Sequence, residues 1–383
     1  MTWHLLTGEY PPQRGGVSTY TRQVARGLAR AGDRVVVWAP PIADPDRAEA
    51  DITVRRLPDT FGRRSRRLLD AELDREPSRL LVQYVPHAFG WRGANLPFCR
   101  WLASRSQRRA WVMFHEVGFP FDARQSPLRN GLAAANRVMA GLVVRSADRV
   151  FISIPGWREM LRPLAGVDAP MTWLPVPSGI DVAGDAARVA AVRERIGGGR
   201  PIVGHFGTYP SSIRARLADV LVRVAAATDG RVLLVGPRGT QLRDELIAAH
   251  ATLADRIVAT GALPEADVSA HIAACDVMLQ PYPDGISTRR TSAMAALAHG
   301  VAVVTTIGWL TEPLWQSSDA VVLAPVDDAA AMAEQACALL ASDAARAHVA
   351  AAGRQLYDER FDVRHTIAVL RDAPAAIPSR ASA

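Results

Sequence analysis

Residues 201–236 read PIVGHFGTYPSSIRARLADVLVRVAAATDGRVLLVG. An apolar run at 201–206 leads into a glycine loop, a helical pattern follows, and a second apolar run occupies residues 231–235. Two short apolar runs on either side of a helical segment are typical of a βαβ unit, in which the strands are parallel and helices cover the sheet. The stretch therefore predicts an α/β fold.

The same alternation extends over the rest of the chain. Further strand-like runs lie at residues 3–7, 34–39, 80–85, 111–114, 149–153, 277–280, 301–305 and 320–323. A stretch rich in proline and glycine at 175–200 interrupts the pattern and predicts a linker. We therefore expect two Rossmann-like domains with doubly wound parallel sheets, residues 1–176 and 177–364, that face a central cleft. A C-terminal helix at about 365–383 is expected to pack back on the first domain.

Composition excludes several classes of protein. The chain has 383 residues, of which 49% are hydrophobic and 22% are charged, as in a folded protein with an ample core. No uncharged apolar run is long enough for a transmembrane helix, and the N-terminus does not have the pattern of a signal peptide. Three widely spaced cysteines, Cys99, Cys275 and Cys337, form no disulfide or zinc pattern and favour a reducing cytoplasm.

Charge divides the chain into two halves. All 45 basic residues are arginines, and residues 1–180 carry a net charge of +10, against −3 for residues 181–383. We expect the densest arginine cluster to bind anionic lipid headgroups or an anionic lipid-linked acceptor at the inner face of the membrane. The alternative is that the cluster is a solvated basic loop. Nucleic-acid binding is not expected, since no module of aromatic and basic residues is present. The cluster consists of Arg55, Arg56, Arg63, Arg64, Arg66 and Arg67.

Two loops of the first half combine residue types that suit a ligand. Gly15 and Gly16 come just before a helix, where unpaired N–H groups and a partial positive charge favour phosphate; a tight turn is the alternative interpretation. His115 and Glu116 follow the strand WVMF, at a carboxyl end. The histidine is suited to hydrogen-bond a sugar hydroxyl or to shuttle a proton, unless local loop contacts hold it.

Two loops of the second half have a similar character. Gly207 and Arg214 belong to a strand, a glycine loop and a helix start that together suit an anion, although a solvated helix face also explains the arginine. The other loop comes before a helix that ends at Gly300, and its residues are Asp284, Gly285, Ile286, Ser287, Thr288, Arg289 and Arg290.

This second loop carries the most detailed prediction. Ser287 or Thr288 is expected to cap the following helix. We expect the amides of residues 285–288 to cradle a pyrophosphate, Asp284 to accept hydrogen bonds from sugar hydroxyls, and Arg289 or Arg290 to neutralise phosphate charge. An ordinary capped helix with a turn before it is the alternative.

These loops resemble those of the retaining glycosyltransferases of family 4, which have the GT-B architecture of two Rossmann-like domains. The resemblance covers nearly the whole chain. It rests on Pro-Pro-x-x-Gly-Gly at residues 11–16, His115-Glu116 in place of His-Asp, LPVPSGID at 174–181, and TGALPEADVSAHIAACDVMLQPY at 260–282. It implies transfer of a sugar from a nucleotide-diphosphate donor to a glycan, lipid-linked or small-molecule acceptor, with retention at the anomeric carbon.

The chain departs from the family pattern at the donor site. The family's signature has two glutamates separated by seven residues, and here Asp284 stands at the first position and Ser292 at the second. In the family the first acid contacts the donor sugar and the second holds the ribose, for which Ser292 offers one neutral hydrogen bond. Thr208 stands where the family has an arginine, and Arg214 is the nearest substitute for its lysine.

Further roles follow from position and from the resemblance. Gly236 follows the strand RVLLV, where a base or ribose can lie against backbone, and the resemblance places Leu263 at the base. It also implies that His115 supports the sugar or its developing positive charge. No Asp-x-Asp triplet or cluster of carboxylates in these loops suggests a bound cation, so we expect a reaction without a metal or other cofactor, in which arginines stabilise the leaving diphosphate. The residues expected to contact the acceptor are Gln83, Tyr84, His87 and Glu116.

Two other functions stay open. A nucleotide-sugar epimerase has the same two-domain architecture, but it needs acid–base groups that are scarce in these loops. A degenerate nucleotide- or glycan-binding protein without catalysis is favoured by Ser292 and Thr208.

Overall fold

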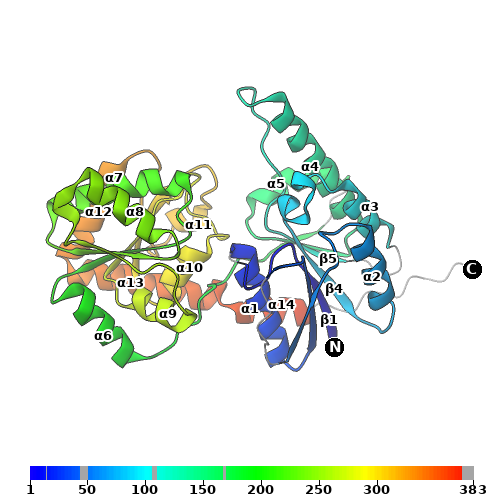
Figure 1. Cartoon of the computed structure of the whole chain (residues 1–383), viewed down its shortest axis with the longest axis horizontal. Helices are drawn as coiled ribbons and strands as arrows, with labels where there is room; N and C mark the ends of the chain where they lie inside the picture. Colours follow the sequence, from blue (N-terminus) through cyan, green and yellow to red (C-terminus); the bar gives the residue numbers. More distant parts are fainter. Residues whose placement is uncertain (14, 44–50, 106–109, 167–169, 373–383) are drawn as a thin grey trace, which may run out of the picture. The chain divides into compact units, whose positions relative to one another are not determined.

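The computed structural model describes residues 1–13, 15–43, 51–105, 110–166 and 170–372, and the chain divides into two units. Unit 1 contains the residues up to Pro175 and those from Val363 onward, and unit 2 is Val176–Asp362 (Figure 1). Each unit has one parallel sheet with helices packed on it, so the predicted α/β class with two Rossmann-like sheets is confirmed. Residues 373–383, the greater part of the predicted C-terminal helix, lie outside the described residues.

Unit 1 is built on a seven-stranded parallel sheet in the order β3-β2-β1-β4-β5-β6-β7. Its strands are β1 (Thr2–Leu6), β2 (Arg34–Ala39), β3 (Ile52–Arg56), β4 (Arg79–Tyr84), β5 (Trp111–Phe114), β6 (Arg149–Ile152) and β7 (Met171–Trp173). Its helices are α1 (Gly16–Arg30), α2 (Arg63–Leu73), α3 (Leu96–Ser104), α4 (Pro127–Ser146), α5 (Gly156–Ala165) and α14 (Val363–Asp372), with short 3-10 turns at Pro86–Phe89 and Trp91–Gly93.

Unit 2 is built on a six-stranded parallel sheet in the order β10-β9-β8-β11-β12-β13. Its strands are β8 (Ile202–Phe206), β9 (Arg231–Val235), β10 (Ile257–Ala259), β11 (Val277–Gln280), β12 (Ala302–Ile307) and β13 (Val322–Pro325). Its helices are α6 (Ala186–Gly197), α7 (Ser211–Ala227), α8 (Gly239–Ala249), α9 (Glu265–Ala273), α10 (Thr291–Ala298), α11 (Pro313–Gln316), α12 (Ala329–Ala341) and α13 (Asp343–Leu356), with a 3-10 turn at Ala251–Leu253 and a π turn at Tyr357–Phe361.

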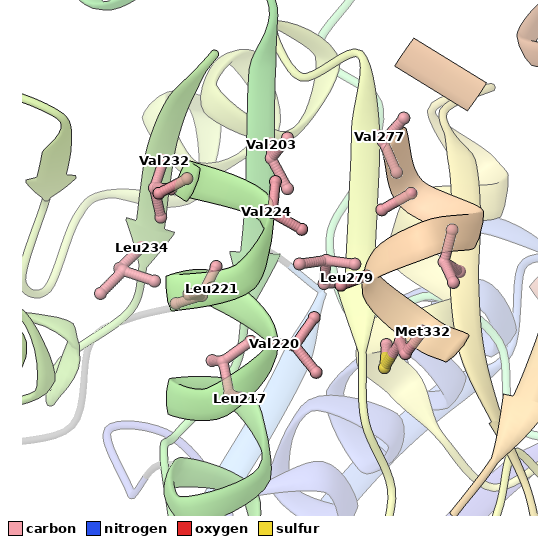
Figure 2. Close-up of a cluster of buried hydrophobic side chains, with 14 of the residues drawn as sticks. Val203, Leu217, Val220, Leu221, Val224, Val232, Leu234, Val277, Leu279 and Met332 are labelled. Atoms are coloured by element: carbon pink, nitrogen blue, oxygen red, sulfur yellow. The ribbon is translucent and has the colours of Figure 1, made fainter. Parts of the chain in front are cut away.

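The core of unit 2 shows why the apolar runs become strands. Helices α7 and α12 lay apolar side chains on one face of the sheet, where the strands present valines and leucines (Figure 2). Burial of a side chain of this size stabilises the fold by about 1.5–3 kcal/mol. The residues that Figure 2 labels in this cluster are Val203, Leu217, Val220, Leu221, Val224, Val232, Leu234, Val277, Leu279 and Met332.

The last described helix, α14, belongs to unit 1 although it follows unit 2 in sequence. It packs against α1, where Gly27 allows the close approach: a Cβ at this position would lie 2.6 Å from Ile367 Cδ1. Arg79 Nη1 donates to the Leu370 carbonyl oxygen over 3.1 Å, and Arg371 Nε lies 3.1 Å from Asp33 Oδ2. A buried apolar face and two polar contacts therefore attach α14 to the first sheet.

Candidate functional site

In unit 2, the turn between β11 and α10 is fixed by its contact with the loop after β12. Gly285 has φ +85°, and a Cβ at this position would lie 2.2 Å from Thr311 Oγ1 and 2.3 Å from the Gly308 nitrogen. The Leu310 nitrogen donates to the Asp284 carbonyl oxygen over 3.0 Å. Only glycine fits where the two loops touch, so the turn holds the Asp284 side chain on a rigid backbone.

The Asp284 carboxylate is paired with both arginines of the same turn. Arg289 Nη2 lies 2.5 Å from Asp284 Oδ2, and Arg290 Nη2 donates to Oδ1. All three side chains are largely buried, with 14%, 19% and 22% of their surfaces exposed. The Arg290 guanidinium also lies over the Tyr282 ring, 4.5 Å from its centroid. The structure thus brings the predicted acid and the two predicted phosphate ligands together, as one triad with a net charge of +1.

The backbone next to this triad is less open than the sequence suggests. The nitrogens of Gly285, Ile286 and Thr288 donate to Tyr282 O, Thr306 O and Glu312 Oε1, over 3.2, 2.8 and 2.9 Å. These three amides therefore have partners, and they do not form the open pyrophosphate cradle that we predicted. Recognition of a diphosphate here has to rest on the arginines.

The prediction of the helix cap is wrong. Helix α10 begins at Thr291, its N-cap residue is Arg290, and no side chain caps it. Ser287 and Thr288 are fully buried instead. Ser287 Oγ has no hydrogen-bond partner among the described residues. The loop makes one more turn before the helix starts because Thr288 is bound to a side chain from another loop.

That side chain is Glu312, which the sequence analysis missed. Its Oε1 accepts hydrogen bonds from the nitrogen and the hydroxyl of Thr288, over 2.9 and 2.6 Å, and its Oε2 accepts one from Trp315 Nε1 over 2.8 Å. Burial raises the pKa of Glu312, and these hydrogen bonds act in the opposite direction. The signal in the sequence is a single acid in the otherwise uncharged segment 307–318.

At the second glutamate position, Ser292 belongs to a neutral network. Its hydroxyl lies 2.7 Å from the Tyr282 hydroxyl and 3.3 Å from Gln280 Oε1. Tyr282 also donates to Gln280 Oε1 over 3.1 Å, and Gln280 Nε2 donates to the Phe206 carbonyl oxygen over 3.2 Å. Burial raises the pKa of Tyr282 to about 12, so no member of this network is charged near neutral pH.

The loops after β8, β9 and β10 meet at the same edge of the sheet. A Cβ on Gly236, whose φ is +132°, would lie 2.1 Å from the Gly207 carbonyl oxygen. The Gly236 nitrogen donates to Thr260 Oγ1 over 3.3 Å, and Gly236 forms an isolated bridge with Gly261. Leu263 follows in the same loop and is half-buried, where it lines a cavity of ≈ 440 Å³ between α6, β10 and α9. Backbone thus forms this part of the edge, as the glycines predicted.

Arg214, by contrast, is engaged elsewhere. It lies in the first turn of α7, and its Nη2 pairs with the half-exposed carboxylate of Glu245 on α8. An exposed ion pair of this kind contributes little to stability. It nonetheless occupies the guanidinium that we predicted for phosphate.

In unit 1, His115 is buried at the end of β5. Its Nε2 lies 2.8 Å from Gln83 Oε1, the edge of its ring faces Tyr20, and its carbonyl oxygen accepts a hydrogen bond from Trp157 Nε1 over 2.9 Å. Burial lowers the pKa of His115 to about 3. The imidazole is therefore neutral near pH 7, which suits a hydrogen-bonding role and not the proton shuttle considered above.

The four predicted acceptor residues separate into two pairs. Gln83 and Tyr84 are fully buried, and Gln83 Nε2 and the Tyr84 hydroxyl have no partner among the described residues. His87 and Glu116 are exposed or half-exposed, and His87 Nδ1 lies 3.4 Å from Glu116 Oε2. Only the second pair lies on the surface of unit 1, where two neighbouring loops bring it together.

The predicted phosphate site at the start of α1 holds an internal acid. The Ser18 nitrogen donates to Glu9 Oε1 over 2.9 Å. A Cβ on Gly15 would lie 2.2 Å from the same oxygen, so a larger residue there would displace the Glu9 side chain; helix α1 begins at Gly16. A carboxylate at a helix N-terminus interacts favourably with the unpaired amides and the helix dipole. Glu9 was not identified from the sequence.

Half of the predicted arginine cluster is used inside unit 1. Arg55 lies in β3, with Nη1 2.6 Å from Glu72 Oε2. Arg56 and Arg66 donate to backbone carbonyl oxygens, over 2.6 and 2.9 Å. The members of the cluster that stay exposed, all on α2, are Arg63, Arg64 and Arg67.

Two structural features are absent from the described residues. None of the helices there is long and apolar enough to cross a membrane. In the same part of the chain, no three His, Cys, Asp or Glu side chains are grouped so as to hold a metal ion.

Comparison with known proteins gives two family matches. Residues 200–342 match the model of the glycosyl transferases group 1, and residues 15–172 match that of the glycosyl transferase 4-like domain. Together they span most of both units. No curated protein sequence matches the chain significantly.

Solved structures resemble the chain over nearly its whole length. Sucrose-phosphate synthase from Thermosynechococcus elongatus is 19% identical, with a TM-score of 0.72 and 97% of each chain covered. HepE from Anabaena in complex with UDP-glucose is 16% identical, with a TM-score of 0.69, and the match covers 98% of this chain and 100% of HepE. An α,α-trehalose-phosphate synthase from Burkholderia xenovorans, in complex with glucose-6-phosphate, is 12% identical, with a TM-score of 0.68 and coverage of 97% and 99%. At these identities the likeness establishes the fold.

Proposed function

Because the chain belongs to the group 1 glycosyltransferases of GT-B type, we propose that it moves a sugar from a nucleoside-diphosphate donor to a glycan, lipid-linked or small-molecule acceptor, with retention and without a metal. The observation that carries the proposal is the triad of Asp284, Arg289 and Arg290 on the turn after β11. In a parallel α/β sheet, ligands bind at this edge. The triad supplies both the positive charge for a diphosphate and an acid for a sugar.

The triad suggests how the donor is taken up. Without a donor, Asp284 neutralises part of the charge of both arginines. A diphosphate carries more negative charge than one carboxylate and forms charge-assisted hydrogen bonds with guanidinium groups. As the arginines turn to the diphosphate, Asp284 is released to accept hydrogen bonds from the hydroxyls of the transferred sugar. The same arginines then stabilise the charge that develops on the leaving group.

The other donor residues are proposed on a weaker basis. Gly207, Gly236 and Leu263 follow strands at the same edge and offer backbone against which the base and ribose can lie. The hydroxyl of Ser292 replaces a carboxylate at the ribose, with its neighbours Tyr282 and Gln280. In unit 1, neutral His115 is proposed to support the sugar, and His87 with Glu116 to contact the acceptor.

The proposal is tested by turnover with a panel of UDP-, GDP-, ADP- and TDP-sugars. UDP-glucose comes first, because the HepE structure contains it. Asp284→Asn should lower donor turnover at least about a hundredfold, since it removes one electrostatic group from the reacting centre. It should not weaken binding of the nucleoside diphosphate, since it removes the carboxylate charge that competes for both arginines. Asp327→Asn, at a side chain that is 85% exposed, is the matched control.

A second candidate function is a binding protein without catalysis. It is favoured by Ser292, whose network has no charge to hold a ribose firmly. Calorimetric binding of a nucleoside diphosphate, with no turnover of any donor in the panel, would select this alternative. Turnover that Asp284→Asn leaves unchanged would exclude the proposed role of the triad.

A further inference from the structure

One part of unit 1 groups several exposed apolar side chains. Eight large hydrophobic side chains of the described residues are exposed, and three of them lie close together in sequence: Phe121 at 54%, Leu128 at 85% and Val138 at 53%. Phe121 belongs to the loop before α4, Leu128 to the first turn of that helix and Val138 to its middle. In Figure 1 this end of α4 extends away from the sheet of its unit. Single exposed apolar residues need no explanation, but a group of this kind marks an interaction surface.

Helix α4 is apolar on two sides. Ala133, Met139, Ala140, Val143 and Val144 are buried and pack toward unit 1. On the other side, small and apolar residues mostly recur every three or four positions and therefore form a second stripe along one face of the helix. This stripe contains no charged side chain and is exposed or half-buried throughout. We call it the α4 face, and it consists of Leu128, Gly131, Ala134, Ala135, Val138 and Leu142.

The charges around the α4 face are mostly positive. Residues 121–147 contain four arginines and one acid, the exposed Asp122, so the segment carries a charge of +3. The Arg137 guanidinium lies 3.9 Å from the centroid of the Phe121 ring, which fixes the exposed ring beside the helix. Arg124 and Arg129 are exposed near the start of α4, and Arg129 lies over Phe119 at 5.8 Å. One end of unit 1 thus combines an apolar stripe, aromatic rings and arginines.

We infer that the α4 face and the loop before it bind an anionic lipid bilayer. A helix that lies in the interface presents an apolar stripe, with phenylalanine among its residues, to the acyl boundary and arginines to the headgroups. Each arginine near an anionic surface adds about 1 kcal/mol of attraction. The three exposed arginines of α2, on the same unit, have no comparable apolar stripe: Leu69 and Leu73 of α2 are buried, and Leu68 alone is half-buried.

Other occupants fit the surface less well. A second copy of the chain would bring two surfaces of charge +3 together, and like charges in an interface oppose association. Nucleic acid binds through charge and polar contacts to phosphates, which leaves the apolar stripe without a role. The inference concerns binding to a membrane and does not depend on the proposed transfer reaction.

The test is flotation of the full chain with vesicles of phosphatidylcholine alone and of phosphatidylcholine mixed with phosphatidylglycerol. The wild type should float with the anionic vesicles and not with the neutral ones. Leu128→Ser combined with Val138→Ser should weaken this binding at least about tenfold, because both side chains lose apolar surface that the bilayer would bury. Arg124→Ser combined with Arg129→Ser should weaken it to a similar degree.

The controls separate this surface from its alternatives. Val182→Ser combined with Val258→Ser removes two exposed valines of unit 2 and should leave flotation unchanged. Arg63→Ser combined with Arg64→Ser tests the α2 arginines and should have a much smaller effect than the α4 variants. All replaced side chains are exposed, and Phe121→Ser in the loop serves as a further variant outside the helix. The inference fails if the wild type does not float, if neutral vesicles bind it equally, or if the α2 or valine controls reduce binding as much as the α4 variants do.

Discussion

Acid should destabilise both units through their buried histidines, and the pKa is lowered most for His115 in unit 1 and His205 in unit 2. His115 in unit 1 is 6% exposed and His205 in unit 2 is 3% exposed, and burial lowers the pKa of each from 6.5 to about 3. Between these two pH values the unfolded chain binds a proton that the folded chain excludes. The stability contributed by the neutral imidazole is therefore fully present above about pH 6.5, and it is lost as the pH falls toward 3.

The expected magnitude follows from the size of the shift. At pH 5, which is about 1.5 pH units below the pKa of the unfolded chain's imidazole, that imidazole is protonated. The imidazole of the folded chain is still neutral at this pH. Each histidine then costs about 2 kcal/mol of folding free energy relative to pH 7, at 1.36 kcal/mol for each pH unit. A loss of this size is a large part of the stability of an ordinary domain.

Urea unfolding at pH 7 and pH 5 measures the effect. His115→Gln keeps an amide group near Gln83, and His205→Asn keeps a short polar side chain; neither titrates in this range. Each variant is expected to start less stable, but the decrease between pH 7 and pH 5 should be smaller than in the wild type by about 2 kcal/mol. His250→Gln, at an exposed position, is the control and should decrease like the wild type. If the two buried variants lose as much stability as the wild type between pH 7 and pH 5, the reasoning about buried neutral histidines is wrong.

Three further predictions concern the turn after β11 and its support. Gly285→Ala should lower the free energy of unfolding by at least about 2 kcal/mol, because the new Cβ clashes with the loop after β12. Gly300 also has a positive φ but has open space around it, so Gly300→Ala should lower this free energy by only about 1 kcal/mol. Thermal unfolding compares the two variants. Because burial raises the pKa of Glu312, the wild type should lose stability relative to the variant Glu312→Gln as the pH rises above 4.5. Urea unfolding of both proteins at pH 4.5 and pH 7 measures the direction of this change. Arg289→Ala combined with Arg290→Ala should weaken nucleoside-diphosphate binding at least about tenfold in calorimetry, and an unchanged affinity would place the diphosphate elsewhere.

The fold could be predicted because parallel strands are buried on both faces. Such strands read as continuous apolar runs, and β9 (RVLLV) and β2 (RVVVWA) are clear examples. The strand β3 (ITVRR) was missed because it lies at the edge of its sheet and ends in two arginines, which were assigned to a basic cluster instead. Short β7, with three residues, gives too little pattern to recognise. Periodicity thus identifies the centre of a sheet better than its edges.

The candidate site was predictable only where its residues are neighbours in sequence. Asp284, Arg289 and Arg290 lie within seven residues of one turn, so the loop alone brings them together. Glu312 was missed because its partner Thr288 lies 24 residues away, and only the packing of two loops joins them. Gln83 was assigned to an acceptor because it ends a strand, but it faces the interior and holds His115. The direction of a side chain at a strand's end depends on the loops that cover it, and a single sequence does not contain that information.

Two of the three predicted anion sites share a property that the sequence reasoning did not foresee: an internal carboxylate occupies each of them. The start of α1 holds the carboxylate of Glu9, and the arginines after β11 hold the carboxylate of Asp284. A cluster of unpaired donors in a folded chain attracts any acid within reach of a short loop, since an unpaired buried charge is costly. A phosphate ligand must therefore compete with an internal carboxylate at each site, which lowers its apparent affinity. An acid close in sequence to a predicted anion site is thus part of the prediction, as a competitor for the ligand.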